Sequence, residues 1–367
     1  MWFRGNEYVE GVLHTTDRMY INNGKADFIK YPAALPSYNG GSISAGDYDG
    51  DGYEDLFLGT RSMPGGYGLS PNSYILKNTQ KANFEMAAHA RLGMITDSEW
   101  ADLNNDGLLD LVFVGDWMPV TILINIGDGK FDNQTEEFGL NETQGMWNCV
   151  KVADVDQNGT MDIIAGNAGL NLKWKASKEH PIQLYLDDYD ENTFLDPIIF
   201  YNFFGENVPF ASKDKLISQI PALKKYFVRY SDFAKAKDIH TLTGKDSIMQ
   251  TKSIKELRSM VFLNENNTKY NAVPLPIEAQ LSTIEDVYFD NGDLYYVGNY
   301  SGYVTELGPS KSNAGGVLSH FKNGNFTQNR SLGLPAHLEG RKIDKISDKT
   351  FIILTNNDSA YTITKKN

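Results

Sequence analysis

Short apolar runs separated by clusters of Asp, Asn and Gly recur along the chain and predict β-strands joined by tight turns. In each unit a short strand leads into an acidic loop, and an apolar run such as residues 56–58 or 111–114 leads out of it. A third strand such as residues 73–77 follows, and then a turn and an outer strand, such as the one that starts at Phe131. Four strands in this order predict one blade of a β-propeller.

The units repeat at a nearly constant spacing, which is the main signal in the sequence. The acidic loops begin at Asp47, Asp102 and Asp154, in steps of 55 and 52 residues. Similar hairpins without an acidic loop lie at residues 19–28, 261–270 and 318–326. We therefore predict an all-β fold, a single β-propeller domain over residues 1–367. Seven blades are expected, with six as the alternative, and the N-terminal hairpin can share a blade with the C-terminal strands.

Each acidic loop has the form Asp-x-Asp/Asn-x-Asp/Asn-Gly-x-x-Asp, a spacing that predicts a calcium site. Alternate residues of a tight turn point inward, so positions 1, 3, 5 and 9 offer side-chain oxygens and position 7 offers a backbone carbonyl. Hard oxygen ligands in an irregular, roomy arrangement favour Ca²⁺ over Mg²⁺, which requires a stricter octahedron. The predicted ligands of the first three sites are Asp47, Asp49, Asp51, Tyr53 and Asp55; Asp102, Asn104, Asp106, Leu108 and Asp110; and Asp154, Asp156, Asn158, Thr160 and Asp162.

A fourth loop has the same spacing but lacks the glycine. Its predicted ligands are Asp188, Asp190, Asn192, Phe194 and Asp196. Gly52, Gly107 and Gly159 occupy position 6 of the first three loops, where the chain reverses and a positive φ is expected. In the fourth loop Thr193 stands there, and a β-branched residue resists that conformation. We therefore expect three calcium sites and a distorted or weaker fourth. The later units, from residue 284 onward, keep their strands but lose the acidic loop, so no metal is expected there.

Composition and charge favour cation binding. The chain of 367 residues is 41% hydrophobic and carries a formal charge of −13. Such acidity argues against binding of free nucleic acid, whose phosphates it would repel. The predicted ligands of the four loops include 13 carboxylates, and like charges gathered this closely are unfavourable without a cation. The single cysteine, Cys149, excludes an internal disulfide framework, and its apolar neighbours favour a packed side chain.

The β pattern is interrupted once. Between residues 209 and 244 a helical pattern replaces it. Its apolar stripe consists of Leu216, Ile220, Leu223, Phe227 and Tyr230. Ser212 is a candidate N-cap, and Pro221 starts a second helix or kinks the first. We predict a small α-helical insertion around residues 210–245, within bounds of about 206–256. It is either a cap packed on the propeller or a lid or docking surface for a partner.

The repeats resemble the FG-GAP or VCBS repeats of integrin-α-like propellers. Beyond the acidic loops, the chain is similar to the bacterial proteins grouped with cartilage acidic protein and the ASPIC/UnbV domain. This likeness rests on residues 117–119, 166–177, 196–199, 274–280 and 298–308. It implies a seven-bladed propeller with Ca²⁺ in its blade loops, exported to the cell surface, the extracellular space or the periplasm. The chain begins almost inside a strand, so we expect a fragment of a larger multidomain protein. Neither a membrane-spanning run nor a signal peptide is visible in it, and an export signal would lie outside such a fragment.

No catalytic motif accompanies the acidic loops. The six histidines lack metal-ligand spacing, and no nucleophile elbow, P-loop or dinucleotide fingerprint appears. The leading hypothesis is therefore a non-catalytic module that binds a protein or glycan on one face of the ring. The candidate ligand-face residues, which otherwise pack the blades, are Trp100, Trp117, Trp147 and Trp174. The alternatives are a glycan lyase or hydrolase with an acidic pair on the central face, and a structural spacer between other domains.

Overall fold

Antiparallel β-sheets make up most of the fold, as predicted. The computed structural model describes residues 18–30, 39–79, 83–356 and 358–365. Within these ranges lie six sheets of three or more strands, and a separate hairpin pairs β1 (Tyr20–Asn22) with β2 (Phe28–Lys30). The fold is all-β and its sheets are consistent with a β-propeller, whereas the blade count stays a prediction. The first residues of the chain, which bear on the prediction of a fragment, lie outside the described residues.

The first two acidic loops each connect the first two strands of a sheet. One sheet has the strand order β3–β4–β5–β6, with the first loop between β3 and β4. The next sheet is built around β8, which pairs with β7 across the second loop, and with β9 and β11. The strands are β3 (Asn39–Gly46), β4 (Asp55–Ser62), β5 (Ser73–Asn78), β6 (Phe84–Ala90), β7 (Met94–Ala101), β8 (Asp110–Met118), β9 (Thr121–Asn125), β10 (Phe131–Asn133) and β11 (Gly145–Met146).

The third sheet is interrupted by a long excursion of the chain. β12 (Cys149–Ala153) and β13 (Asp162–Gly166) flank the third acidic loop, but β13 then pairs with β18 (Met260–Asn264), whose partner is β19 (Tyr270–Pro274). Between β13 and β18 the chain builds a separate sheet in the order β16–β15–β14–β17. Its strands are β14 (Ile182–Asp187), β15 (Asp196–Phe203), β16 (Glu206–Pro209) and β17 (Gln250–Ile254). The fourth acidic loop belongs to this inserted sheet, so the excursion is longer than the predicted insertion.

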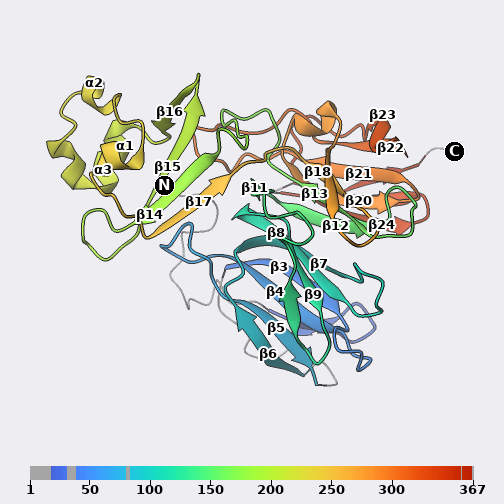
Figure 1. Ribbon diagram of the computed structural model, residues 1–367. Helices are drawn as coiled ribbons and strands as arrows, with labels where there is room; N and C mark the ends of the chain where they lie inside the picture. The colour runs from blue at the N-terminus through green and yellow to red at the C-terminus, as the bar shows by residue number, and fades with distance from the viewer. Residues whose placement is uncertain (1–17, 31–38, 80–82, 357, 366–367) are drawn as a thin grey trace.

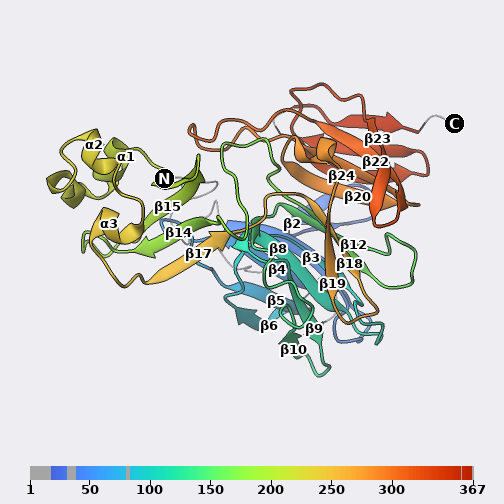
Figure 2. The same cartoon turned by 45° about the horizontal axis from the view of Figure 1, so that its top comes forward.

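The predicted helical insertion lies between β16 and β17. It consists of α1 (Lys213–Gln219), η2 (Pro221–Lys225), α2 (Tyr230–Phe233) and α3 (Ile239–Thr243). Ser212 caps α1 by accepting the N–H of Lys215, and Pro221 opens η2. Four members of the apolar stripe pack on the inserted sheet, but Tyr230 is 57% exposed and was wrongly assigned to it. Figures 1 and 2 show the helices at the outer end of this sheet, away from the C-terminal strands.

Two sheets follow the excursion. One contains β20 (Ile284–Asp290), β21 (Asp293–Gly298), β22 (Gly315–Lys322) and β23 (Asn325–Ser331), and the other contains β24 (Gly340–Ser347), β25 (Thr350–Thr355) and β26 (Tyr361–Thr364). The first strands of five successive sheets lie side by side, in the order β3, β7, β12, β20 and β24. Sheets that follow one another through their first strands have the arrangement of propeller blades. The inserted sheet contacts the second sheet through β17, which lies against β8 and β11.

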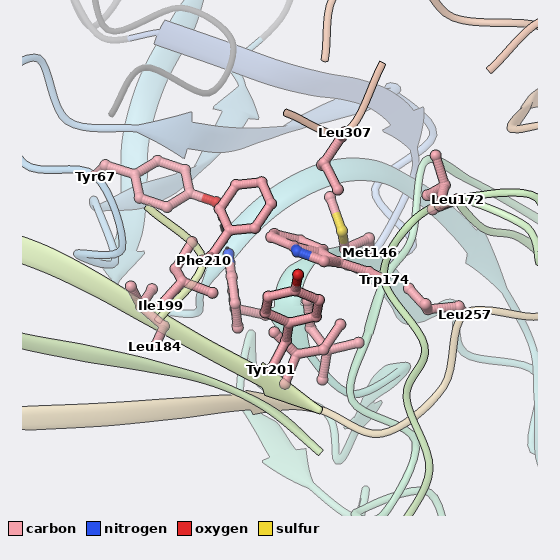
Figure 3. Close-up of a cluster of buried hydrophobic side chains, with 14 of the residues drawn as sticks. Tyr67, Met146, Leu172, Trp174, Leu184, Ile199, Tyr201, Phe210, Leu257 and Leu307 are labelled. Atoms are coloured by element: carbon pink, nitrogen blue, oxygen red, sulfur yellow. Dashed lines mark hydrogen bonds between the residues drawn. The ribbon is translucent and has the colours of Figure 1, made fainter. Parts of the chain in front are cut away.

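The four tryptophans proposed for a ligand face are core residues instead. Trp147 and Trp174 are fully buried, and Trp100 and Trp117 are 9% and 3% exposed. Trp117 and Trp174 meet edge to face in the cluster between the second sheet and the inserted sheet, and the Trp117 indole donates its N–H to the Tyr67 hydroxyl at 2.7 Å. Figure 3 shows Trp174 inside this cluster. Large aromatic rings fill the space between neighbouring sheets, so the prediction of a tryptophan-lined face is wrong.

Buried carboxylates join neighbouring sheets along these first strands. Asp97 of β7 accepts the backbone N–H of Val150 in β12 at 2.9 Å. Asp286 of β20 accepts that of Ile343 in β24 at 2.8 Å, and the Lys342 ammonium lies 3.0 Å from its other oxygen. Burial raises the pKa of both carboxyls, that of Asp286 to about 6. These acidic residues therefore fasten one sheet to the next.

Candidate metal centre

The four acidic loops share one backbone conformation because the carboxylate at position 1 organises each of them. Asp47 accepts the N–H of Asp51 at 3.0 Å and that of Gly52 at 2.8 Å. In the other three loops the position-1 Asp accepts the corresponding two N–H groups at 2.7–3.1 Å. These hydrogen bonds are all local, so the nine residues of each loop are sufficient to determine its backbone conformation.

The residue at position 6 has a left-handed backbone in every loop. Its φ is +88° at Gly52, Gly107 and Gly159, and +74° at Thr193. The expectation of a positive φ at this position is confirmed, and it explains the glycine. The fourth loop keeps the conformation despite a β-branched residue, so it forms with local strain. Position 4 also has a positive φ, at Gly50, Asn105, Gln157 and Glu191. The sequence pattern did not predict that second reversal.

The carboxylate at position 9 is buried and connects each loop to its sheet. These residues are Asp55, Asp110, Asp162 and Asp196, and none is more than 5% exposed. Asp110 accepts the N–H of Leu103 within its loop and that of Asn125 at the end of the third strand, both at 2.8 Å. Burial raises the pKa of Asp110 and Asp162 to about 6. A cation bound beside them would favour the ionised form and offset that cost.

An asparagine that was not predicted closes each of the first three loops. Asn78, Asn125 and Asn264 end the third strands of their sheets and donate their backbone N–H to the position-9 carboxylate at 2.7–2.8 Å. The Asn125 amide also donates to the carbonyl of Leu109 in its own loop, at 3.1 Å, and to that of Tyr48 in the preceding loop, at 2.8 Å. Asn264 makes the same pair of bonds to the third and second loops. Successive acidic loops are therefore linked.

Three of the four loops bring three carboxylates together. The residues at positions 1, 3 and 9 place one oxygen each within 4.8 Å of one another in Asp47, Asp49 and Asp55; in Asp154, Asp156 and Asp162; and in Asp188, Asp190 and Asp196. Two buried oxygens of these clusters, Asp55 Oδ2 and Asp190 Oδ1, have no hydrogen-bond partner in the described part of the chain. Buried oxygens without a donor are costly unless a cation satisfies them. The three clusters could therefore hold metal ions.

The second loop and position 5 depart from this arrangement. Asn104 replaces the carboxylate at position 3 of the second loop, so that loop offers an amide oxygen where the others offer a charged one. In the first loop the Lys77 ammonium contacts Asp49 and lies 3.1 Å from Asp51. Lys77 thus pairs with Asp49, which belongs to the cluster, and with Asp51, which does not. The predicted carbonyl ligands, namely Tyr53, Leu108, Thr160 and Phe194, stay predictions, as does ligation through position 5.

Family comparisons agree with this loop geometry. Residues 39–68 match the FG-GAP repeat, and residues 102–165 match the FG-GAP-like repeat. The molecule is thus an all-β protein of repeated sheets with acidic loops, and two of its segments match FG-GAP-type repeats. A comparison with curated proteins finds no match.

Among solved structures, the chain is similar to one that describes how an Agrocybe aegerita lectin recognises non-reducing terminal N-acetylglucosamine. The two sequences are 17% identical over 85% of this chain and 73% of the other, with a TM-score of 0.29. That TM-score is too low to carry any property of the lectin over to this chain.

Proposed function

We propose that this chain is a calcium-stabilised, non-catalytic β-propeller module that binds a protein or a glycan outside the cell. The observation that carries the proposal is the set of three Asp clusters, two of which contain a buried oxygen without a donor. Each cluster combines carboxylates with the irregular backbone of a tight loop. Such a site suits Ca²⁺, which accepts six to eight oxygen ligands in flexible geometry, better than Mg²⁺.

The buried carboxylates outside the loops support a non-catalytic role. Asp97, Glu99 and Asp286 are candidate acidic groups for a glycan-cleaving enzyme, since burial raises the pKa of all three. Each of them, however, accepts a backbone N–H of the neighbouring sheet. A general acid or base must instead present its oxygen to the substrate.

The location and the partners follow from the resemblance and from charge. The FG-GAP repeats and the further likeness to the cartilage acidic protein and ASPIC/UnbV group favour an exported, multidomain protein. Extracellular calcium is abundant enough to fill sites with dissociation constants of about 10⁻⁴–10⁻³ M. A formal charge of −13 disfavours nucleic acid as the partner. None of the helices in the described ranges has the length and apolar character to cross a bilayer.

Thermal unfolding in calcium and in chelator tests the proposal. A cation that binds only the folded chain stabilises it by about 2.7 kcal/mol per site at a hundredfold excess over the dissociation constant. We expect calcium to raise the Tm well above its value in chelator, and magnesium to raise it less. An equal Tm in calcium and chelator would contradict the proposal.

A matched variant separates site binding from general salt effects. The triple variant D49N/D156N/D190N removes the position-3 charge of all three clusters. Asn104 already occupies this position in the second loop, whose backbone hydrogen bonds are the same, so the variant should keep the loop conformation. We expect most of the calcium-dependent rise in Tm to disappear, whereas stability in chelator should fall only by the small contribution of the exposed Lys77–Asp49 ion pair.

A further inference from the structure

The helical insertion differs in charge from the rest of the molecule. Residues 210–245 hold eight Lys and Arg against three Asp, a formal charge of +5, which leaves −18 for the remainder of the chain. A basic surface on an acidic protein directs anionic ligands to one place. The helices stand at the outer end of the inserted sheet in both views (Figures 1 and 2). The positive charge is therefore presented away from the acidic loops of the first sheets.

Part of this positive charge is not neutralised by ion pairs within the described part of the chain. Five lysines of the insertion pair with carboxylates, namely Lys213, Lys215, Lys235, Lys237 and Lys245. Lys224, Lys225 and Arg229 are exposed and form no ion pair with any residue that the structure describes. Three neighbouring cations without a partner repel one another, so an anionic ligand would lower their energy.

A hollow between α1 and the segment after η2 adjoins these cations. It has a volume of about 440 Å³, within the range of small-ligand sites. Its charged lining consists of Lys213, Asp214 and Lys224, and its apolar lining of Ile217, Phe227 and Val228. The hollow thus combines the Lys224 ammonium, the Lys213–Asp214 ion pair and three apolar side chains, a lining that suits a ligand with both a carboxylate and a C–H face.

Exposed aromatic rings flank the same cations. Tyr226 is 71% exposed and Tyr230 is 57% exposed. The Tyr230 ring is held in place, because its hydroxyl donates to Asp214 and the Lys213 ammonium lies 4.7 Å from its centre. An exposed tyrosine with a fixed orientation offers a flat apolar face at low entropic cost.

We propose that this surface, formed by Lys213, Lys224, Lys225, Tyr226, Arg229 and Tyr230, binds an acidic polysaccharide that contains uronate sugars. The cations pair with the carboxylates, and the tyrosines pack against the C–H faces of the pyranose rings. The inference rests on the proposed function, since it names the ligand class and the place of binding on the same module.

Two other polyanions fit the surface less well. A membrane ligand requires an exposed apolar helix face, whereas Leu216, Ile220 and Leu223 of this insertion are buried against the sheet. Nucleic acid carries one phosphate per nucleotide, and the charge of −18 elsewhere opposes so dense a polyanion. A uronate polymer combines carboxylates with the C–H faces of pyranose rings, and therefore matches a few cations beside two aromatic rings more closely.

Calorimetric titration of the full chain in calcium tests the proposal. The probes are hyaluronan and chondroitin sulfate oligosaccharides, with dextran, polyglutamate and polyuridylate for comparison. The variant K224Q/K225Q/R229Q removes the three unpaired cations from exposed positions. The control K25Q/K130Q/K322Q removes three exposed lysines from hairpins of other sheets. We expect the uronate oligosaccharides to bind, the first variant to lose roughly 100-fold in affinity, and the control to stay close to the parent.

Several results would overturn the inference. These are the absence of uronate binding, equal losses in the two variants, and tighter binding of polyglutamate or polyuridylate than of the oligosaccharides. The Tm of the same samples in calcium and chelator distinguishes this failure from that of the proposed function. If calcium still raises the Tm while uronates do not bind, only the ligand assignment is wrong. If calcium has no effect, the module itself is wrongly described.

Discussion

The backbone at position 6 of the acidic loops allows a quantitative test of the loop model through the substitution Gly159→Ala. Gly159 has a φ of +88°, and a Cβ placed there would meet no heavy atom within 4 Å. The cost of the substitution is therefore conformational rather than steric. A left-handed backbone costs a residue with a Cβ about 1–2 kcal/mol, and the lower entropy of the unfolded alanine chain returns about 0.5–1 kcal/mol. We expect a net destabilisation of about 1 kcal/mol.

The reciprocal substitution Thr193→Gly should stabilise the protein. Thr193 has a φ of +74° in the fourth loop, which otherwise forms the same hydrogen bonds. Glycine removes the strain of a β-branched residue but adds unfolded-state entropy, so the expected gain is also about 1 kcal/mol. Asparagine, which tolerates this conformation, should fall between the two extremes in both loops.

Urea unfolding in excess calcium, followed by tryptophan fluorescence, measures both effects. Trp147 is fully buried and packs edge to face on Phe262 of the third sheet, and Trp174 is buried against the inserted sheet. The tryptophan emission therefore includes a reporter near each of the two loops. The rank order glycine, asparagine, then alanine or threonine should hold in both loops. If Gly159→Ala left the midpoint unchanged while Thr193→Gly lowered it, the strain argument would be wrong.

Two further predictions concern the contacts between sheets. Asn125→Ala should destabilise the chain by about 2–3 kcal/mol, because it leaves the carbonyls of Leu109 and Tyr48 without their buried donor. The control is Asn133→Ala at an exposed position, and equal urea midpoints for the two variants would refute the prediction. Asp286 has a pKa raised by burial from 3.8 to about 6, so its contribution to stability is full below about pH 4 and is lost as the pH rises through 6. The free energy of unfolding of Asp286→Asn should therefore rise relative to that of the parent by at most about 3 kcal/mol between pH 4 and pH 7.5. Urea unfolding measures this difference, with Asp344→Asn at an exposed position as the control. A difference that does not change with pH would contradict the prediction.

The acidic loops could be predicted from the sequence because their interactions are local. Positions 1, 5 and 6 bond to one another within a few residues, so a nine-residue pattern determines the turn and the glycine. The helical insertion was predictable for a similar reason, since its cap at Ser212 and its start at Pro221 are local signals. The nine-residue spacing therefore corresponds to the same backbone turn in all four loops, and to a cluster of three carboxylates in three of them.

The interruption of the third sheet could not be predicted in the same way. β13 pairs with β18 across the whole inserted sheet, and no local pattern encodes a pairing of that separation. The sequence nevertheless contains a signal for the third strand of each of these sheets. Asn78, Asn125 and Asn264 each end an apolar run, and Asn264 thereby marks β18 as the third strand of the interrupted sheet. The tryptophans illustrate a feature that was predicted and is not present. An aromatic residue near a strand end is compatible with a core position and with a ligand face, and only its burial distinguishes the two.

The same asparagines explain why the acidic loops matter to the whole molecule rather than to single turns. Asn125 and Asn264 each join the position-8 carbonyl of their own loop to the position-2 carbonyl of the preceding loop. The backbone N–H of Asn264 also binds Asp162, the position-9 carboxylate in the Asp cluster of the third loop. A cation that fixes one carboxylate therefore restrains an asparagine that contacts two sheets. Binding at the third loop should in this way stiffen the contact between the second and third sheets.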